Sequence, residues 1–205
     1  MKLLERQFYN RDTVEVARAL LGKLLVHHVD GLQRIGRITE VEAYLGPHDQ
    51  AAHSRRGVTP RTQVMFGEPG HAYVYLIYGM HHCLNVVTEP AGRGCAVLLR
   101  ALEPVANIHA NTRGPGLLCK AMGVNLLQNR ADLCGEQLYI ADDGMRPDAI
   151  VATPRIGVDY AGEWALAPLR FLIEGNHWVS GPRKASKSLP GRKKRPTAGR
   201  MRHQS

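Results

Sequence analysis

The chain has 205 residues, of which 44% are hydrophobic and 22% charged, so it is long enough to bury one substantial core and is not of a disordered or fibrous class. No stretch approaches the roughly 18 consecutive apolar residues of a membrane-spanning helix, and the opening sequence MKLLERQFYN lacks the apolar run of a signal peptide. We therefore expect a single domain that contacts no membrane.

The net charge of +9 resides at the end of the sequence. Residues 181–205 hold nine basic side chains and no acidic one, so the preceding residues are close to neutral. The segment is also rich in Pro, Gly and Ser, with almost nothing to bury. We therefore expect a domain over residues 1–180 and a disordered basic tail over residues 181–205. The tail either contacts a polyanion such as nucleic acid or only improves solubility.

The first predicted elements are a helix and two strands. Asp12 or Thr13 can cap a helix through VEVARALLG, which Gly22 can end. LLVHHV then predicts a strand, and GLQRIGRITEVEAYLG predicts a turn and a second strand. These elements have an ordinary amphipathic pattern, so they help to predict the fold and do not point to a function.

The end of that second strand, ITEVEAYL over residues 38–45, carries two acids on one face. A regular strand would place Ile38, Glu40, Glu42 and Tyr44 together and leave Val41 and its neighbours facing the core. The acids mark either a solvated edge, which is the commoner case, or a catalytic carboxylate at the mouth of a pocket.

Residues 46–70 are rich in Pro, Gly, His and Arg and predict a long loop, a kind of segment that is often functional. HAYVYLIYG then predicts a strand and CLNVV its antiparallel return, with residues 78–80 at the hairpin tip. Tyr73 and Tyr75 share one face of the strand. They are either good strand formers or a platform for stacking on a flat base, and the tip could act as a wedge in a minor groove.

The second half begins with GCAVLLRALEP, which predicts a very apolar, central strand. Residues 111–124, NTRGPGLLCKAMGV, predict a Gly-Pro loop that opens a short helix, where free backbone N–H groups could bind a phosphate. Short strands and turns follow up to residue 180. The four cysteines are scattered and lack a CxxC pair, so we expect buried thiols and no disulfide.

Metal and cofactor motifs are missing from the sequence. There is no HExxH, no paired Cys/His spacing, no phosphate loop and no GxSxG. The one loose set of oxygen and nitrogen ligands is Glu40, Glu42, Asp49 and His53, which we keep as an alternative metal site.

Longer blocks of sequence identify a family. EVEAYLGPHDQAAHS, TPR, MFGEPGHAYVYLIYGMHHCLNVV, VLLRALEP, GPG, RIGV and AGEWA occur in this order. Together they resemble the alkyladenine (3-methylpurine) DNA glycosylase family from about residue 7 to residue 180. Only the basic tail falls outside the resemblance.

The resemblance implies a fold and an activity. The fold would be a single mixed α+β domain around a curved antiparallel sheet, with a protruding β-hairpin. The activity would be hydrolysis of the N-glycosidic bond of alkylated or deaminated purines flipped out of double-stranded DNA. The family uses no metal and no organic cofactor, and we expect a monomer.

The family's motifs assign roles to seven residues. Glu42 would be the general base that activates water, and Arg100 would help hold that water. The walls of the base pocket would be Tyr44, His53 and Tyr75. Asn85 would screen bases against a guanine amino group, and Tyr78 would fill the gap left by the flipped base.

Two features are specific to this sequence. The family usually has a lysine after its Gly-Pro turn, where this chain has Leu117; either Lys120 takes its place, or phosphate contacts rest on backbone groups and the tail. The pocket motifs also lack a lysine that could form a Schiff base, so we expect a monofunctional enzyme.

Three other functions remain as alternatives: a non-catalytic damaged-DNA recognition protein, a metal-dependent hydrolase, and a structural nucleoid protein that uses mainly the tail. No organelle signal is evident apart from RKKRP in the tail. The expected location is the cytoplasm, with the nucleoid, in a bacterium, or the nucleus in a eukaryote.

Overall fold

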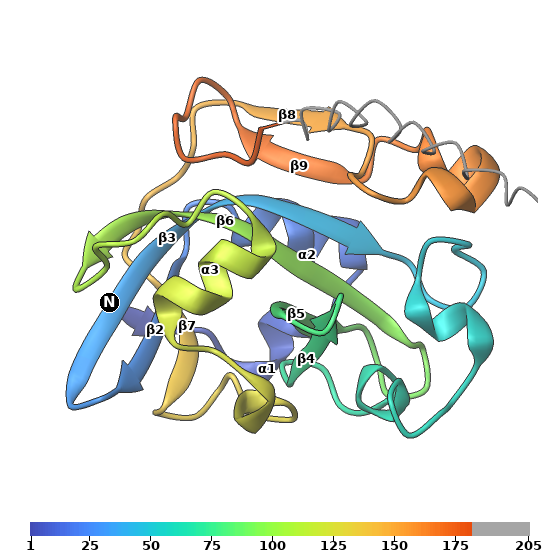
Figure 1. Ribbon diagram of the computed structural model, residues 1–205, viewed down its shortest axis with the longest axis horizontal. Helices are drawn as coiled ribbons and strands as arrows, with labels where there is room; N and C mark the ends of the chain where they lie inside the picture. Colours follow the sequence, from blue (N-terminus) through green and yellow to red (C-terminus); the bar gives the residue numbers. More distant parts are fainter. Residues whose placement is uncertain (182–205) are drawn as a thin grey trace, which may run out of the picture.

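The computed structural model describes residues 1–181 (Figure 1), so the predicted basic tail, apart from its first residue, lies outside the described residues. The strands are β1 (Lys2–Leu3), β2 (Leu24–Val29), β3 (Leu32–Tyr44), β4 (Ala72–Ile77), β5 (His81–Thr88), β6 (Cys95–Ala106), β7 (Leu138–Asp142), β8 (Ile150–Thr153) and β9 (Arg170–Ile173). The α-helices are α1 (Arg6–Tyr9), α2 (Thr13–Leu20) and α3 (Pro115–Met122). Short 3₁₀ helices are η1 (His53–Arg56), η2 (Gln63–Phe66), η3 (Leu126–Gln128) and η4 (Asp159–Ala165).

The described strands form one antiparallel sheet. Its main path runs β1-β7-β2-β3-β6-β5-β4, and β9 pairs with β3 and with β8. Strand β3 is long enough to pair with β2 along its first half and with β9 near its end, while β6 covers its other edge. In Figure 1 the β8–β9 pair lies above β3. This arrangement confirms the expected mixed α+β fold around an antiparallel sheet.

Local sequence accounts for the helices. Asp12 caps α2 by accepting hydrogen bonds from the N–H groups of Val14 and Glu15 at 2.9 and 3.1 Å, as predicted. Gly22 follows the end of α2 with a φ of +87°, a conformation that glycine adopts without strain. In α3 the first residue is Pro115, which suits a first helical position because its missing N–H would have no partner there.

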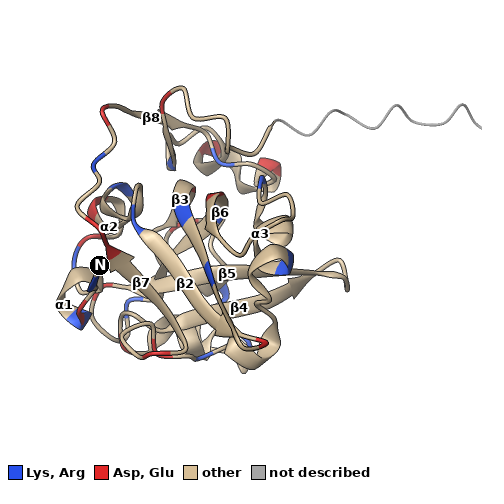
Figure 2. Ribbon diagram, turned by 90° about the vertical axis from the view of Figure 1, so that its left-hand side faces the viewer, with Lys and Arg blue, Asp and Glu red and all other residues tan. Residues whose placement is uncertain are grey.

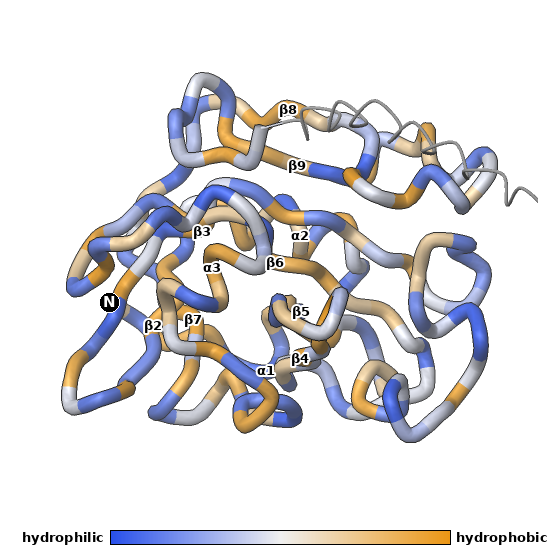
Figure 3. The backbone as a smooth tube through the Cα atoms, viewed as in Figure 1, coloured by the Kyte–Doolittle hydropathy of each residue, from blue (hydrophilic) through white to orange (hydrophobic). Residues whose placement is uncertain are grey.

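Helices pack on both faces of the sheet. Val41 and Ala43 of β3, Val97 and Leu99 of β6 and Val86 of β5 belong to one buried apolar cluster. Helix α2 packs on this cluster behind the sheet, whereas α3 lies in front (Figures 1 and 2). The hydrophobic stretches of β6 and α3 accordingly run through the middle of the molecule (Figure 3).

Strand β3 corrects two expectations. It is a central strand, and both Glu40 and Glu42 are completely buried, so the solvated-edge interpretation is wrong. The alternation is also irregular, because the pairing with β6 shifts between Ile38 and Glu40 and again between Glu40 and Val41. Such bulges reset which side chains share a face. Ile38 therefore lies in the apolar cluster with Val41 instead of beside the acids.

The predicted hairpin is formed by β4 and β5, and Figure 2 shows it extending beyond the sheet on the right. The segment over residues 46–70 is mostly loop, as expected, with two single turns of 3₁₀ helix. The four cysteines, all within the described part, are free thiols; three are buried and Cys134 is partly exposed. Among residues 1–181, no helix is both long and apolar enough to span a bilayer.

Candidate active site

The strand register brings four side chains into one row across the sheet. Glu42 of β3 pairs with Leu98 of β6, Leu98 pairs with Asn85 of β5, and Asn85 pairs with Tyr73 of β4. Because directly opposite residues in an antiparallel sheet point to the same face, all four side chains lie on the side away from α2. Residues two positions along each strand form a parallel row on that face.

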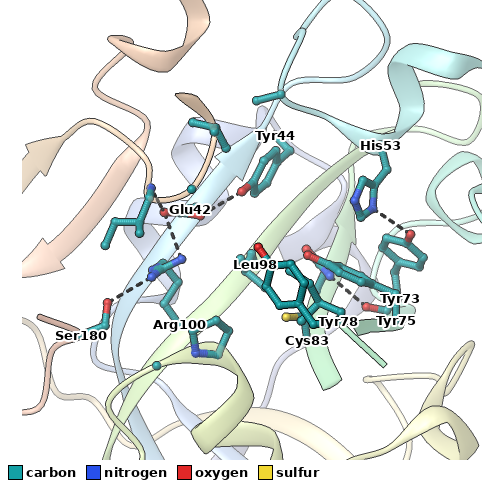
Figure 4. Close-up of a pocket in the computed structure, with 18 of the residues that line it drawn as sticks. Glu42, Tyr44, His53, Tyr73, Tyr75, Tyr78, Cys83, Leu98, Arg100 and Ser180 are labelled. Carbon is teal, nitrogen blue, oxygen red and sulfur yellow. Dashed lines mark hydrogen bonds and ion pairs between the residues drawn. The ribbon is translucent and has the colours of Figure 1, made fainter. Parts of the chain in front are cut away.

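These rows form the floor of a cavity of about 380 Å³, which Figure 4 shows in close-up. Strands β3 to β6 supply the floor, the loop after β3 supplies one wall, and residues 113–115 and 156–158 close the opposite side. All seven residues that the resemblance singled out line this one cavity: Glu42, Tyr44, His53, Tyr75, Tyr78, Asn85 and Arg100.

The carboxylate of Glu42 is buried and held by three donors. Its Oε1 accepts from the backbone N–H of Ile156 at 2.7 Å and lies 3.2 Å from Nη1 of Arg100. Its Oε2 accepts the Tyr44 hydroxyl proton at 2.9 Å. A carboxylate oxygen has two lone pairs. Oε1 therefore has both of its acceptor positions in use, and Oε2 keeps one for a further donor on the cavity side.

Arg100 is fixed through all three of its guanidinium nitrogens. Nε donates to Glu40 at 2.9 Å, Nη1 faces Glu42, and Nη2 donates to the Ser180 hydroxyl at 3.2 Å. Glu40 also accepts from Arg170 at 3.0 Å, so two buried carboxylates face two guanidinium groups. Burial disfavours the charge on Arg100, but the neighbouring Glu42 and Glu40 carboxylates outweigh it and raise its pKa.

Asp49 belongs to a separate buried ion pair. Arg155 donates to both of its carboxylate oxygens, through Nη1 to Oδ2 and through Nη2 to Oδ1 at 2.9 Å. Arg155 also donates to the carbonyl of Ala43 at 2.8 Å, and its guanidinium carbon lies 4.7 Å from the Tyr44 ring centroid. The pair therefore anchors the loop after β3 and supports the outer side of the Tyr44 ring.

The alternative metal site of Glu40, Glu42, Asp49 and His53 is not assembled. The Glu40 carboxylate is hydrogen-bonded to Arg100 and Arg170, and the Asp49 carboxylate to Arg155. The His53 ring is hydrogen-bonded to the Tyr73 hydroxyl. Within residues 1–181, no three His, Cys, Asp or Glu side chains are grouped so that they could hold a metal ion.

An aromatic cluster forms the far end of the cavity. Nδ1 of His53 lies 3.0 Å from the Tyr73 hydroxyl, to which it is hydrogen-bonded, and its ring meets that of Tyr75 edge to face at 4.6 Å. Burial, reinforced by the charges of Arg61 and Arg56, lowers the pKa of His53 to about 4. The imidazole is therefore neutral at physiological pH.

Tyr75 and Asn85 complete the cavity on the hairpin side. The rings of Tyr73 and Tyr75 lie 5.4 Å apart, which confirms that they share a face of β4. Asn85 is buried and its amide donates to the Tyr73 carbonyl at 3.0 Å, so its orientation is fixed. Burial raises the pKa of the Tyr75 hydroxyl, which stays protonated.

Tyr78 lies at the hairpin tip in an unusual backbone conformation. Tyr78 and Gly79 both have positive φ, +53° and +69°, and the N–H of Met80 donates to the Ile77 carbonyl at 3.2 Å. Positive φ at both central residues is typical of a type I′ turn, which favours Asn-Gly. A tyrosine at such a position is strained, and its side chain is 69% exposed.

A second hollow of about 430 Å³ shares His53 and Tyr160 with the cavity. It is lined by Arg55, Arg56 and Arg61, all exposed, and no acidic residue lines it. Its lining can therefore attract an anion. Arg61 also lies over the Tyr75 ring at 5.1 Å, so this basic surface directly adjoins the aromatic end of the cavity.

Neither Leu117 nor Lys120 is among the residues that line the cavity, and both are exposed on α3. Gly114 and Pro115, at the start of α3, are among them. The Gly-Pro turn therefore meets the cavity through the beginning of the helix. No lysine lines the cavity in the described part of the chain.

The sequence did not point to every residue of the site. Tyr73, which the sequence placed on the same strand face as Tyr75, does line the cavity. The backbone N–H of Ile156 and the side chain of Ser180 gave no such signal, since they meet β3 from 114 and 140 residues away. Glu40, which the sequence left unexplained, proves to be the carboxylate that anchors Arg100.

Comparisons with known proteins agree with this geometry. The family described as methylpurine-DNA glycosylase matches residues 7–177. A candidate 3-methyladenine DNA glycosylase of Legionella pneumophila (strain Lens) is 59% identical over 182 residues, covering 88% of this chain and 99% of the relative. Proteins of the same name from Anaeromyxobacter dehalogenans (strain 2CP-C) and Myxococcus xanthus (strain DK1622) are 54% and 52% identical. They cover 87% and 95% of this chain, and 87% and 99% of their own lengths.

Proposed function

This chain belongs to the methylpurine-DNA glycosylase family, and from that premise we propose that it removes alkylated or deaminated purines that are flipped out of double-stranded DNA. It is an enzyme of the DNA-3-methyladenine glycosylase class, a hydrolase of N-glycosyl bonds. The proposal rests above all on the buried Glu42 carboxylate at the wall of a cavity lined by tyrosines and a neutral histidine.

In the proposed mechanism, Glu42 is the general base. Its Oε2 has one acceptor position left after the Tyr44 bond, and a water there would be both oriented and deprotonated by the carboxylate. The transition state of glycosidic cleavage carries positive charge on the sugar, which a fixed carboxylate stabilises. Arg100 holds Oε1, so that Oε2 stays directed at the water.

The cavity suits a flat, electron-poor base. Tyr44 and the pair of Tyr75 and His53 supply aromatic surfaces at its two ends, and a neutral His53 adds no repulsion toward a purine made cationic by alkylation. Asn85 faces the cavity with a fixed amide, which supports a role in rejecting bases that carry an extra amino group.

The hairpin and the arginines support a duplex as the substrate. Tyr78 projects from the tip of β4–β5 with a large exposed ring, which fits a side chain that replaces the flipped base in the stack. The hollow lined by Arg55, Arg56 and Arg61 can contact backbone phosphates beside the cavity. The named relatives are bacterial, so we expect this enzyme to act with the nucleoid of a bacterial cell.

Base release tests the function directly. We would use duplexes carrying hypoxanthine or ethenoadenine, in EDTA, with the wild type and Glu42→Gln. We expect the wild type to leave an abasic site that breaks only on alkali treatment, as a monofunctional enzyme does. Glu42→Gln should slow single-turnover release by at least about 100-fold, because it removes the general base.

The matched control is Glu163→Gln, the same substitution at an exposed residue of η4, which should keep the wild-type rate. Damage-specific binding without base release by either protein would instead indicate a non-catalytic recognition protein. Release that EDTA abolishes would contradict the metal-free mechanism.

A further inference from the structure

The last residues that the structure describes, 178–181, lie against the catalytic strands. The Thr39 hydroxyl of β3 donates to the carbonyl of Trp178, and Nε of Arg113 donates to the carbonyl of Val179 at 3.1 Å. Ser180 and Gly181 then reach the wall of the cavity. These residues follow residue 177, where the match to the family ends.

Ser180 makes three hydrogen bonds within the buried charge network. Its backbone N–H donates to Oε2 of Glu40, and its hydroxyl donates to Oε1 of Glu40 at 2.7 Å. The same hydroxyl oxygen accepts from Nη2 of Arg100 at 3.2 Å. Figure 4 shows Ser180 and Glu42 on either side of the Arg100 guanidinium. The side chain is buried, so water does not readily replace these bonds.

A serine hydroxyl fits this place because it donates and accepts at once. The donated bond stabilises the Glu40 carboxylate, and the accepted bond fixes the end of Arg100 that neither glutamate holds. Without it, Nη2 loses its buried acceptor, and the guanidinium plane can turn about Nε. Nη1 would then no longer be held at 3.2 Å from Glu42.

We propose that Ser180 is a positioning residue for the glycosylase reaction, acting through Arg100 on the Glu42 carboxylate. The inference deepens the proposed function and rests on it, because it presupposes that Glu42 activates water. Ser180 itself touches neither water nor substrate in this scheme. The C-terminal end of the described chain is therefore part of the catalytic apparatus.

The test compares single-turnover rates at saturating enzyme for the full-length wild type, Ser180→Ala and Ser180→Thr. We expect Ser180→Ala to slow base release about 10-fold, because a small misplacement of a catalytic group lowers the rate strongly. The DNA dissociation constant should stay within a factor of two or so of the wild type. Ser180→Thr keeps the hydroxyl and should recover most of the lost rate.

A double-mutant cycle separates positioning from mere stability. In an Arg100→Lys background the hydroxyl has no guanidinium to hold, so adding Ser180→Ala should change the rate by less than about 2-fold. A purely structural role for Ser180 would instead multiply the two losses. The matched control is Thr13→Val, which removes a buried hydroxyl bonded to Glu89 and Thr88, none of which lines the cavity. This variant should lower the melting temperature and leave the rate unchanged.

The proposal is overturned if Ser180→Ala keeps the wild-type rate, or if its loss is as large in the Arg100→Lys background. Should Ser180→Ala fold poorly, Ser180→Gly removes the same hydroxyl and retains the backbone N–H. Hydrogen exchange of the Arg100 Nε–H, followed by NMR, gives a readout without DNA and should accelerate in either variant. A well-folded wild type that releases no base refutes the proposed function itself, whereas an active wild type with an equally active Ser180→Ala refutes only the positioning role.

Discussion

At the scale of single residues, the site combines a fully charged half and a neutral half. Glu40 and Glu42 of β3 face Arg100 of β6 and Arg170 of β9, so two carboxylates are matched by two guanidinium groups. At the other end, His53 is neutral because burial and two neighbouring arginines oppose its protonation. The charged half suits water activation, and the neutral half suits a flat base.

The depressed pKa of His53 predicts how stability changes with pH. In the unfolded chain His53 takes up a proton near its ordinary pKa of about 6.5, whereas in the folded protein it does so only near pH 4. The contribution of the neutral His53 to the free energy of unfolding is therefore fully present above about pH 6.5. It is lost as the pH falls from 6.5 to 4, and we expect the free energy of unfolding to drop by about 1 to 3 kcal/mol over this range.

Urea denaturation of the wild type and His53→Asn at several pH values from 4 to 7 isolates this contribution. His27, which is also buried with a lowered pKa, and the carboxyl groups titrate in both proteins and cancel in the difference. The stability advantage of the wild type over the variant should shrink as the pH is lowered. A difference that stays constant with pH would show that His53 does not titrate as described.

At the scale of elements, the β4–β5 turn contains a tyrosine where a less strained residue would make the hairpin more stable. The β4–β5 turn has positive φ at Tyr78 and Gly79, and an asparagine would fit the first of these positions with less strain. A tyrosine there indicates that the exposed ring matters more than the turn energy. Strain of this kind is common where a side chain has to be presented to a partner.

Tyr78→Asn should therefore change stability and activity in opposite directions. We expect the free energy of unfolding to rise by about 1 kcal/mol, because asparagine tolerates the left-handed conformation better. Excision from a paired duplex should fall about 10-fold or more, since nothing then fills the gap left by the base. Urea denaturation and single-turnover excision measure the two effects.

A lesion placed opposite an abasic site provides the control for this variant. Such a base is already unpaired and needs less help to leave the stack, so the loss in Tyr78→Asn should be much smaller. An equal loss on both substrates would place the role of Tyr78 inside the pocket instead of in the duplex.

At the scale of the whole molecule, the basic segment directly follows, in sequence, residues that line the cavity. The described part ends at Gly181 on the cavity wall, and all nine basic side chains of residues 181–205 follow it in sequence. We expect these charges to add affinity for DNA without taking part in the chemical step. Their proposed contribution is general attraction to phosphates.

A chain that stops after Gly181 tests this division. It keeps the Ser180 contacts and removes the tail, so DNA binding should weaken most at low salt, and the dependence of log K on log salt should become shallower by up to about 0.9 per lost phosphate contact. Single-turnover release at saturating enzyme should stay near the wild-type rate. A large fall in that chemical rate would assign the tail a role in the site.

The sequence by itself determined the main elements, the central position of β6, the hairpin and the motif residues that gather in the cavity. Each follows from local periodicity, turn chemistry or a block of adjacent residues. Only the tertiary structure decided how Glu40 is used, because the bulges in β3 alter the alternation of its faces. It also decided that Ile156 and Ser180 meet the two acids, since contacts across 114 and 140 residues depend on how strands and loops pack, and no local pattern encodes them.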